Sequence, residues 1–285
     1  MKITNKHNLP ESIYNAIVND DYVKVGDYSA TSLIKPYQML ALERKHADEI
    51  ETDASDMLWM LLGKAMHHIL ETGNHANSII ESRLQVTVGD IVLSAKPDLY
   101  HIADKSIDDY KVTSAYSFIL GDKPEWEQQL NINAFIYQEN GFPVEQLRIY
   151  AILRDHMKSK ALSDRDYPQI PFQTVPIALW EFHNIRTFIE DRIQGHEQSK
   201  EDPNFIRCSN AERWYKGSQW AVMKEGRKSA LRVFDTEKEA DDLLLTLDSK
   251  HSKIERKGAY VRCEGYCNAS KFCEQYKNSQ IKEGV

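Results

Sequence analysis

The chain has 285 residues, of which 41% are hydrophobic and 28% are charged. A chain of this length and composition can bury a full globular core, which excludes disorder as the default state. Its formal net charge of −7 argues against a generally basic nucleic-acid-binding protein. No apolar run approaches the roughly 18 to 20 residues of a membrane span, and the N-terminus lacks the apolar stretch of a signal peptide, so we expect a cytoplasmic protein.

Two helices are predicted in the first 70 residues. Residues 28–37 indicate a turn or cap that leads into a short helix, and residues 54–70 indicate a longer one. In the longer helix Leu58, Leu61 and Ala65 share one face at helical spacing. Apolar residues also occupy its other sides, so we predict that it is covered on more than one flank.

An antiparallel meander follows the second helix. The predicted strands are residues 84–88, 91–102 and 107–112, joined by a Gly89-Asp90 turn and a loop at 103–106. Short connections of this kind join neighbouring antiparallel strands, so the three strands should lie side by side.

The rest of the chain alternates helices with strands. We predict a helix from Asp122 and Pro124 to Gly141, a strand at 147–153, a helix at 177–198, a hairpin of strands 220–223 and 230–234, and a helix from the Thr236-x-x-Glu239 capping box to about Leu247. The charge changes along the chain, since residues 206–285 carry a net +4 and the residues before them −11. We therefore predict a core at 1–205 with an N-terminal helical region, and a hairpin-helix extension at 206–285 that carries a cysteine cluster and packs on the core.

Two carboxylates and one ammonium are predicted on one face of the meander. If Ile102 pairs with Ile107 across the loop, Asp98 lies opposite Lys111, and Asp109 is one diagonal step from Asp98. Side chains alternate between faces with a period of two, so all three project from the same face. A register slip of one residue would break this arrangement.

Such a group on an apolar sheet face is costly unless it binds something. A hard divalent cation such as Mg²⁺ or Mn²⁺ takes oxygen ligands of this kind, polarises a scissile phosphate and lowers the pKa of a bound water. Lys111 could then orient that water or stabilise the developing charge. The alternative is a plain cross-strand salt bridge between Asp98 and Lys111, with Asp109 solvated near the turn.

Four short motifs follow one another in a recognisable order. They are Gly63-Lys-Ala-Met-His67-His-Ile-Leu-Glu71, Lys96-Pro-Asp98, Ile107-Asp-Asp109-Tyr-Lys111 and Gln129-Leu-Asn-Ile-Asn-Ala-Phe-Ile-Tyr137. In order and spacing they resemble the RecB-like branch of the PD-(D/E)XK nucleases. The resemblance implies a restriction-endonuclease-like α/β core, in which a mixed sheet is flanked by helices.

The resemblance also implies roles for individual residues. The metal would be held by His67, Asp98, Asp109 and the backbone carbonyl of Tyr110. Lys111 would be catalytic, and Gln129 would lie beside the site and help to hold substrate or water. In two positions the chain departs from the family: Ala95 replaces a glycine of the second motif, and Asn133 stands where the family has a tyrosine four residues after the glutamine.

The cysteines form a second candidate site. Cys263-x3-Cys267-x5-Cys273 resembles the C-terminal triplet of the AddB-like and CRISPR-adaptation iron–sulfur nucleases, although their fourth cysteine precedes the core and Cys208 follows it here. Four thiolates suit a [4Fe–4S] cluster or a structural Zn²⁺, and free thiols are the third alternative. A bound metal would tie Cys208 to the triplet and close the insert between them into a loop.

Together these features predict a Mg²⁺- or Mn²⁺-dependent deoxyribonuclease. The resemblance implies an exonuclease or flap nuclease that prefers single-stranded DNA or DNA ends and acts in phage or mobile-element replication, recombination or repair in a bacterial host cell. DNA and a single-strand-binding or recombination protein are the expected partners. Two alternatives stay open: a catalytically silent nuclease-fold protein that binds DNA or a host protein, and a small-molecule phosphohydrolase.

Overall fold

The computed structural model describes residues 2–19, 23, 25–73, 77–119, 121 and 123–281. Its contacts divide the chain into two compact units. The first unit comprises Met1–Lys35 and Glu51–Gln198, and the second comprises Pro36–Ile50 and Ser199–Val285. The division that we predicted near residue 205 stays a prediction. No helix in the described part of the chain is long and apolar enough to cross a membrane.

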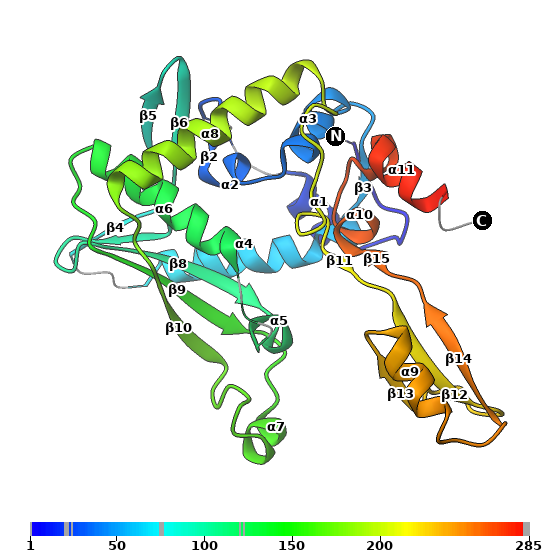
Figure 1. Ribbon diagram of the computed structural model, residues 1–285. Helices are drawn as coiled ribbons and strands as arrows, with labels where there is room; N and C mark the ends of the chain where they lie inside the picture. The colour runs from blue at the N-terminus through cyan, green and yellow to red at the C-terminus, as the bar shows by residue number, and fades with distance from the viewer. Residues whose placement is uncertain are drawn as a thin grey trace. The chain divides into compact units, whose positions relative to one another are not determined.

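A five-stranded mixed sheet forms the centre of the first unit (Figure 1). Its order is β10 (Phe172–Ile177), β9 (Gln146–Leu153), β8 (Ser106–Thr113), β7 (Leu99–His101) and β4 (Ser78–Ile80). The central strands β8 and β9 run parallel, and the other neighbours are antiparallel. The first unit also holds the sheet of β2 (Tyr28–Ser29), β6 (Ile91–Ala95) and β5 (Leu84–Val88), and the parallel pair of β1 (Lys2–Thr4) and β3 (Glu51–Asp53).

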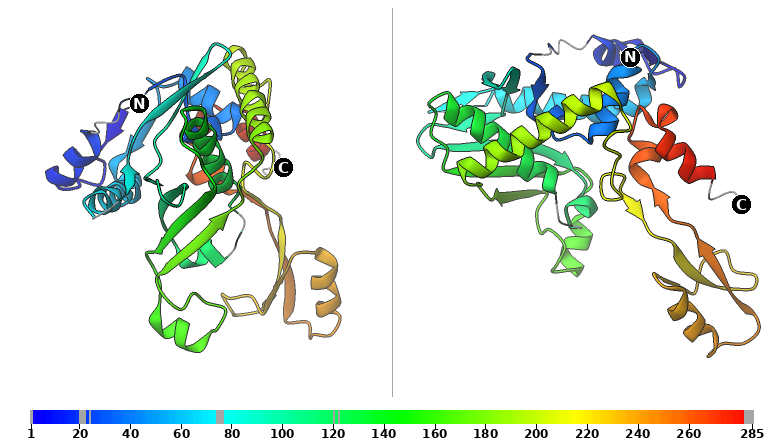
Figure 2. Two further views of the ribbon diagram at one scale, coloured as in Figure 1. Left: turned by 90° about the vertical axis from the view of Figure 1, so that its left-hand side faces the viewer. Right: turned by 45° about the horizontal axis from the view of Figure 1, so that its top comes forward.

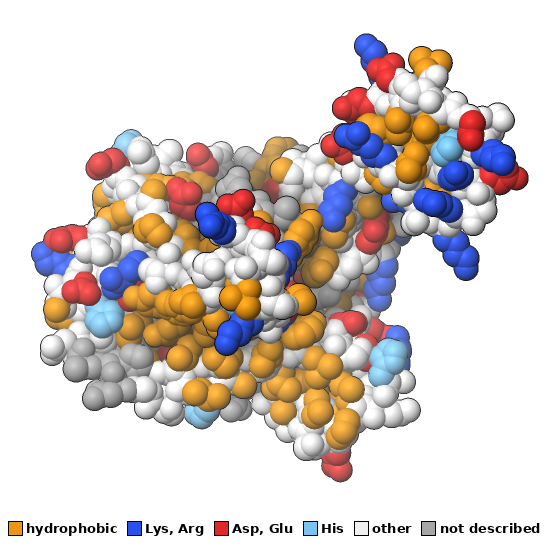
Figure 3. All heavy atoms as spheres, turned by 90° about the horizontal axis from the view of Figure 1, so that it is seen from below, with side chains coloured by type: hydrophobic (Ala, Val, Ile, Leu, Met, Phe, Trp, Pro, Cys, Tyr) orange, Lys and Arg blue, Asp and Glu red, His pale blue; other side chains and the backbone are white. Residues whose placement is uncertain are grey.

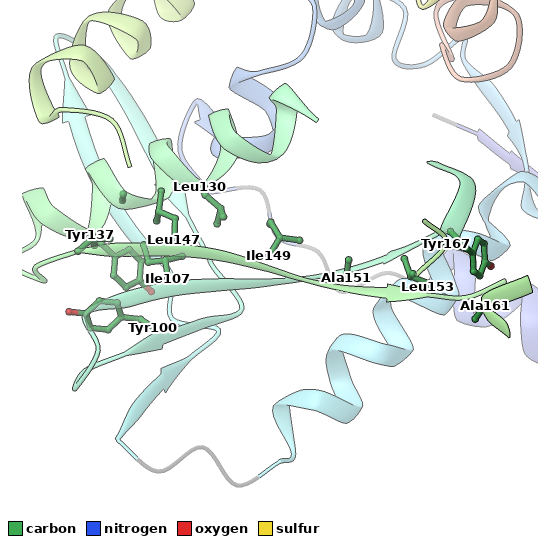
Figure 4. Packing of buried hydrophobic residues seen from close by; sticks show 13 residues of the cluster. Tyr100, Ile107, Leu130, Tyr137, Leu147, Ile149, Ala151, Leu153, Ala161 and Tyr167 are labelled. Carbon is green, nitrogen blue, oxygen red and sulfur yellow. The ribbon is translucent and has the colours of Figure 1, made fainter. Parts of the chain in front are cut away.

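The core of the first unit lies between this sheet and α6 (Pro124–Glu139). Figure 4 shows Leu130 and Tyr137 of α6 turned toward Leu147 and Ile149 of β9, and all four side chains are buried. The helix α8 (Phe182–Glu201) lies on the outer side of α6 (Figures 1 and 2), where the rings of Phe135 and Phe182 stack at 5.1 Å. Helices therefore flank the mixed sheet, as expected of an α/β protein.

The helix α4 (Leu58–Glu71) lies on the other side of the strands from α6. Our prediction that it is covered on more than one flank is wrong, because none of its residues is buried and Trp59 remains 64% exposed. It rests on the sheet with one half-buried stripe that includes Gly63, Met66, His67 and Leu70. Hydrophobic side chains also gather on the molecular face that Figure 3 shows. Apolar composition alone did not fix how many neighbours this helix has.

The strand predicted at 91–102 is in fact two strands. β6 and β7 belong to different sheets, and the three residues between them, Lys96, Pro97 and Asp98, are not in a strand. Proline has no N–H to give to a strand ladder and restricts the residue before it, so a continuous strand is disfavoured there. Because of this break, Asp98 stands just before β7 instead of inside a long strand.

The segment predicted as one helix at 177–198 begins as a strand. β10 ends at Ile177, and α8 starts only at Phe182. The helix before β9 agrees with the sequence prediction from Pro124 onward, and Asp122 lies outside the described residues. The remaining elements of the first unit are α1 (Glu11–Val18), α2 (Ala30–Leu33), a 3-10 turn (Ala54–Met57), α5 (Ala115–Ile119) and α7 (Lys158–Ser163).

The second unit contains the predicted hairpin and helix. β12 (Gln219–Lys224) pairs antiparallel with β13 (Arg232–Phe234), and the Thr236 side chain accepts a hydrogen bond from the Glu239 backbone at the start of α9 (Glu237–Leu244). An unpredicted strand, β14 (His251–Arg256), completes this sheet. The other elements are α3 (Tyr37–Lys45), β11 (Tyr215–Lys216), β15 (Ala259–Tyr260), α10 (Val261–Gly265), a 3-10 turn (Ser270–Phe272) and α11 (Glu274–Ile281).

Candidate metal centre and cysteine site

The register between β7 and β8 sets the positions of the acidic side chains. Tyr100 lies opposite Ile107, where we predicted Ile102, so that prediction is wrong by two residues. A shift of two keeps every side chain on its predicted face, because the side-chain period is also two. Continued by one residue, the observed register places Asp98 beside Asp109, and the Tyr110 backbone N–H donates to Asp98 Oδ2 at 2.7 Å.

His67 reaches this position from α4. Its Nδ1 lies 3.0 Å from Asp98 Oδ1, and both side chains are largely shielded from solvent. The hydrogen bond to Asp98 raises the pKa of His67, while burial acts in the opposite direction. The carboxylate thus fixes the orientation of the imidazole beside the acidic pair.

Asp109 is held in a buried network with Lys111 and Gln129. Lys111 Nζ lies 2.7 Å from Asp109 Oδ2 and donates to Gln129 Oε1 at 3.2 Å, and Gln129 Nε2 donates to Asp109 Oδ1 at 3.3 Å. Burial raises the pKa of Asp109, and the Lys111 charge opposes that shift. The alternative salt bridge between Asp98 and Lys111 is therefore wrong, because Lys111 pairs with Asp109.

The neighbouring acid, Asp108, points to the opposite face of the sheet. It is fully buried and accepts two hydrogen bonds from Arg148, from Nε at 2.7 Å and from Nη2 at 3.0 Å. A carboxylate neutralised by a two-point guanidinium contact is satisfied within the fold. Of the two adjacent acids, only Asp109 is therefore available to the site.

A small cavity adjoins these groups. It has a volume of about 10 Å³, roughly the space of one water molecule, and it is lined by His67, Leu70, Glu71, Ile80, Glu81, Asp98 and Tyr110. Among the described residues, His67, Glu81 and Asp98 are the group of potential metal ligands whose ligand atoms all lie within 4.8 Å of one another. Asp109 is not part of this group and is paired with Lys111.

Sequence reasoning missed Glu81. It directly follows β4, a strand of three residues that is too short to show an alternating pattern. An acid placed after the apolar pair Ile79 and Ile80, shortly before the meander, was the available signal. That signal gains meaning only once β4 is seen to pair with β7.

A wider cleft opens from the same group. Its volume is about 810 Å³, and His67, Glu81 and Asp98 contribute to its wall. Three basic residues, Lys64, Arg83 and Lys96, line it as well, although the chain as a whole is acidic. Glu71 lines it too, so its wall carries three basic and three acidic side chains.

The four cysteines converge in the second unit. They are free of disulfides, and all four line one cavity of about 20 Å³. Met39, Leu42 and Tyr276 add an apolar wall, and Cys273 packs in a small core with Leu42, Ile50 and Ala269. Segment 36–50 thus contributes to the cysteine site, which sequence reasoning did not anticipate.

The surroundings of Cys208 and Cys267 favour the neutral thiol. Burial raises the pKa of Cys208 to about 12 and that of Cys267 to about 11. The Sγ atoms do not form a group of three within 4.8 Å of one another in the described structure. Four sulfurs around one tetrahedral zinc, at about 2.3 Å from the metal, would be closer together than this. The thiols are therefore not arranged as a preformed tetrahedral zinc site.

Comparisons with known proteins gave distant likenesses. No family model and no curated protein matches the chain. One similar solved structure is that of SSO0001, with 16% identity and a TM-score of 0.44 over 64% of this chain and 83% of that chain. Another is a phage-related exonuclease from Haemophilus somnus 129PT, with 10% identity and a TM-score of 0.30 over 67% of this chain and 78% of that chain. Neither likeness assigns a function to this chain.

Proposed function

We propose that the first unit is a divalent-metal-dependent deoxyribonuclease of the RecB-like PD-(D/E)XK type. One observation carries the proposal. The His67–Asp98 pair lies beside an ion-sized cavity, and the ion pair of Asp109 with Lys111 lies next to it on the same face of the sheet. A fold gains nothing from burying two carboxylates side by side unless positive charge neutralises them.

The residues present fit a hard cation. Asp98, Asp109 and the carbonyl of Tyr110 offer oxygen atoms, and His67 offers a nitrogen. Asp109 Oδ2 is buried and lies 2.7 Å from the Lys111 ammonium. Carboxylate oxygens are hard ligands, which supports Mg²⁺ or Mn²⁺ as the ion.

The chemistry follows from these positions. A bound divalent ion polarises a phosphate oxygen and lowers the pKa of a coordinated water. Lys111, oriented by Asp109 and Gln129, places a fixed positive charge beside the ligand oxygens, where it can orient the attacking water and stabilise charge on the phosphate. Gln129 acts through Lys111 and Asp109 by fixing both groups.

The cleft supports a polyanionic substrate. Its wall carries three basic and three acidic side chains, so a divalent ion bound at the acids would give it the net positive charge that attracts a nucleic-acid backbone. We propose single-stranded DNA or DNA ends as substrate, in phage or mobile-element replication, recombination or repair in the bacterial cytoplasm. A single-strand-binding or recombination protein is the proposed partner.

For the second unit we propose a [4Fe–4S] cluster held by Cys208, Cys263, Cys267 and Cys273, with Zn²⁺ as the alternative. Their convergence on one cavity supports a shared metal group, and their spacing in the sequence resembles that of iron–sulfur nucleases. The cluster would cross-link residues that are far apart in the chain and so stabilise the second unit. Anaerobic purification followed by iron, sulfide and zinc analysis distinguishes the alternatives.

Degradation of end-labelled DNA tests the nuclease proposal. Single- and double-stranded DNA are incubated with Mg²⁺ or Mn²⁺ and with wild type, Lys111→Ala or the control Lys105→Ala, which removes an exposed lysine paired with Glu145. We expect metal-dependent cutting that only Lys111→Ala abolishes. DNA binding without cutting would instead support the silent binding protein, and hydrolysis of simple phosphate esters alone would support the phosphohydrolase.

A further inference from the structure

Glu81 occupies a position that the nuclease motifs do not cover. We propose that Glu81 is a further ligand of the metal centre, and that Lys96 is the counterion which it exchanges for the metal. This inference rests on the proposed function, because it assumes an ion beside His67 and Asp98. It adds one ligand to the proposed metal centre and links metal binding to the wide cleft that Lys96 lines.

The position of Glu81 in the sheet supports this role. β4 pairs Ile80 with Leu99, and β7 pairs Leu99 with Asp108. Continued by one residue, these registers bring Glu81, Asp98 and Asp109 into a row across three neighbouring strands. The hydrogen bond from the Glu81 backbone N–H to the Asp98 carbonyl, at 3.2 Å, agrees with that register.

The side chain of Glu81 is directed at the centre. One of its carboxylate oxygens lies within 4.8 Å of ligand atoms of both His67 and Asp98, and Glu81 lines both the ion-sized cavity and the wider cleft. Glu71 lines the same two spaces but is not part of the ligand group. Glu71 therefore provides a matched control, an acid of equal charge a few ångströms from the centre.

Lys96 forms an ion pair with Glu81. Both side chains retain contact with solvent, at 40% and 19% exposure, so water can reach each partner when the pair opens. A divalent cation carries twice the charge of the ammonium and can therefore compete with Lys96 for the carboxylate. Lys96 also lines the wide cleft, so its released ammonium is available to a substrate phosphate.

Metal binding and DNA binding should then be coupled. A metal that occupies Glu81 frees Lys96 for the DNA, and DNA that holds Lys96 leaves Glu81 for the metal. Coupling between two binding sites is reciprocal, so each ligand raises the affinity for the other by the same factor. An ordinary salt bridge between Glu81 and Lys96 would produce no such coupling.

Titration with Mn²⁺ alone tests the ligand role, with free Mn²⁺ measured by electron paramagnetic resonance. The full chain is compared with Glu81→Gln, Asp98→Asn, Glu71→Gln and Lys96→Met, each checked for an unchanged thermal transition; Glu81→Asp is the substitute if Glu81→Gln fails to fold. We expect Glu81→Gln to weaken Mn²⁺ binding about tenfold or more, Glu71→Gln to leave it unchanged and Lys96→Met to strengthen it.

Wild-type affinity in Glu81→Gln, with loss of Mn²⁺ binding in Asp98→Asn, would overturn this inference and leave the proposed function standing. If Asp98→Asn also binds Mn²⁺ with wild-type affinity, the proposed metal centre and the proposed function are both refuted.

Binding of a fluorescent single-stranded oligonucleotide tests the coupling. The measurement uses Lys111→Ala protein, so that no DNA is cut, with and without Mn²⁺. We expect Mn²⁺ to strengthen DNA binding, and we expect most of that gain to disappear when Lys96→Met is added. An equal gain in both proteins would refute the exchange of Lys96.

Discussion

The metal centre of the first unit and the cysteine site of the second differ in how they are held together. In the first, strand pairing and hydrogen bonds fix Asp98, Asp109 and Lys111, and a lysine charge opposes the effect of burial on Asp109. In the second, burial raises the pKa of Cys208, and Glu212 and the other cysteines raise it further. The first site is therefore held in place by the fold itself, whereas Cys208 and Cys267 would become thiolates only with the proposed metal bound.

The two sites should respond differently to loss of the proposed metal. A preorganised centre should lose activity but little stability when its ion is removed, because the sheet holds the ligands. The cysteine site should lose stability, because the proposed metal would be its cross-link.

Asp98→Asn should abolish the activity of the first unit and leave its fold intact. Asparagine can still accept the hydrogen bond from the Tyr110 backbone, but it loses the charge that a cation requires. We expect cleavage of labelled DNA to fall by about a thousandfold, as for loss of a major electrostatic contribution. The thermal unfolding temperature, measured in parallel, should change little. A large drop in that temperature would mean that the centre is not preorganised.

Lys111→Met should lower the free energy of unfolding, because it leaves the buried carboxylate of Asp109 without its partner. Removing one partner of a largely buried ion pair costs about 3 kcal/mol, measured as a change in the free energy of unfolding in urea near neutral pH. Burial already raises the folded-state pKa of Asp109 above its unfolded value, and loss of Lys111 raises it further. A carboxyl group with a raised folded-state pKa stabilises less as the pH rises through that interval. The defect should therefore shrink between pH 8 and pH 5, and a defect that grows on acidification would contradict this account.

Cys263→Ser should destabilise the second unit through loss of its metal. We expect purified variant protein to contain little iron or zinc and its second unit to unfold earlier, by about 2 kcal/mol or more given the affinity of thiolate sites. Proteolysis mapped by mass spectrometry locates the opened unit. Equal metal content and equal protease resistance in variant and wild type would refute a structural metal at the cysteines.

Gly63→Ala should have the smallest effect. A Cβ at this position of α4 meets nothing within 4 Å, and alanine is favoured over glycine in a helix by up to about 1 kcal/mol. We expect a modest increase in the free energy of unfolding of the first unit, measured in urea. A decrease would mean that the space beside Gly63 is filled in solution.

The sequence predicted the faces of the key side chains better than their partners. Asp98, Asp109 and Lys111 share the predicted environment because a two-residue shift in register preserves side-chain faces. The pairing partner of Lys111 could not be predicted, because Pro97 interrupts the strand and moves Asp98. Glu81 could not be found either, because its neighbours in space come from β4 and β7, and β4 is too short to leave a pattern.

The sequence also could not predict how deeply each helix is buried. α4 is apolar on several sides, yet its burial depends on which elements pack around it, and they leave Trp59 exposed. The helix predicted from Ile177 begins only at Phe182, because Ile177 fits helical spacing but is the last residue of β10. In both cases local pattern was overridden by tertiary arrangement.

The most direct test of the central claim is a crystal structure of the full chain grown with Mn²⁺, with anomalous diffraction measured at the manganese edge. The account predicts an anomalous peak between His67 and Asp98, at the roughly 2.0–2.6 Å separations typical of such ligands, with an oxygen of Glu81 in contact. A crystal of active protein with no peak in this cavity, or with manganese only elsewhere, would contradict it.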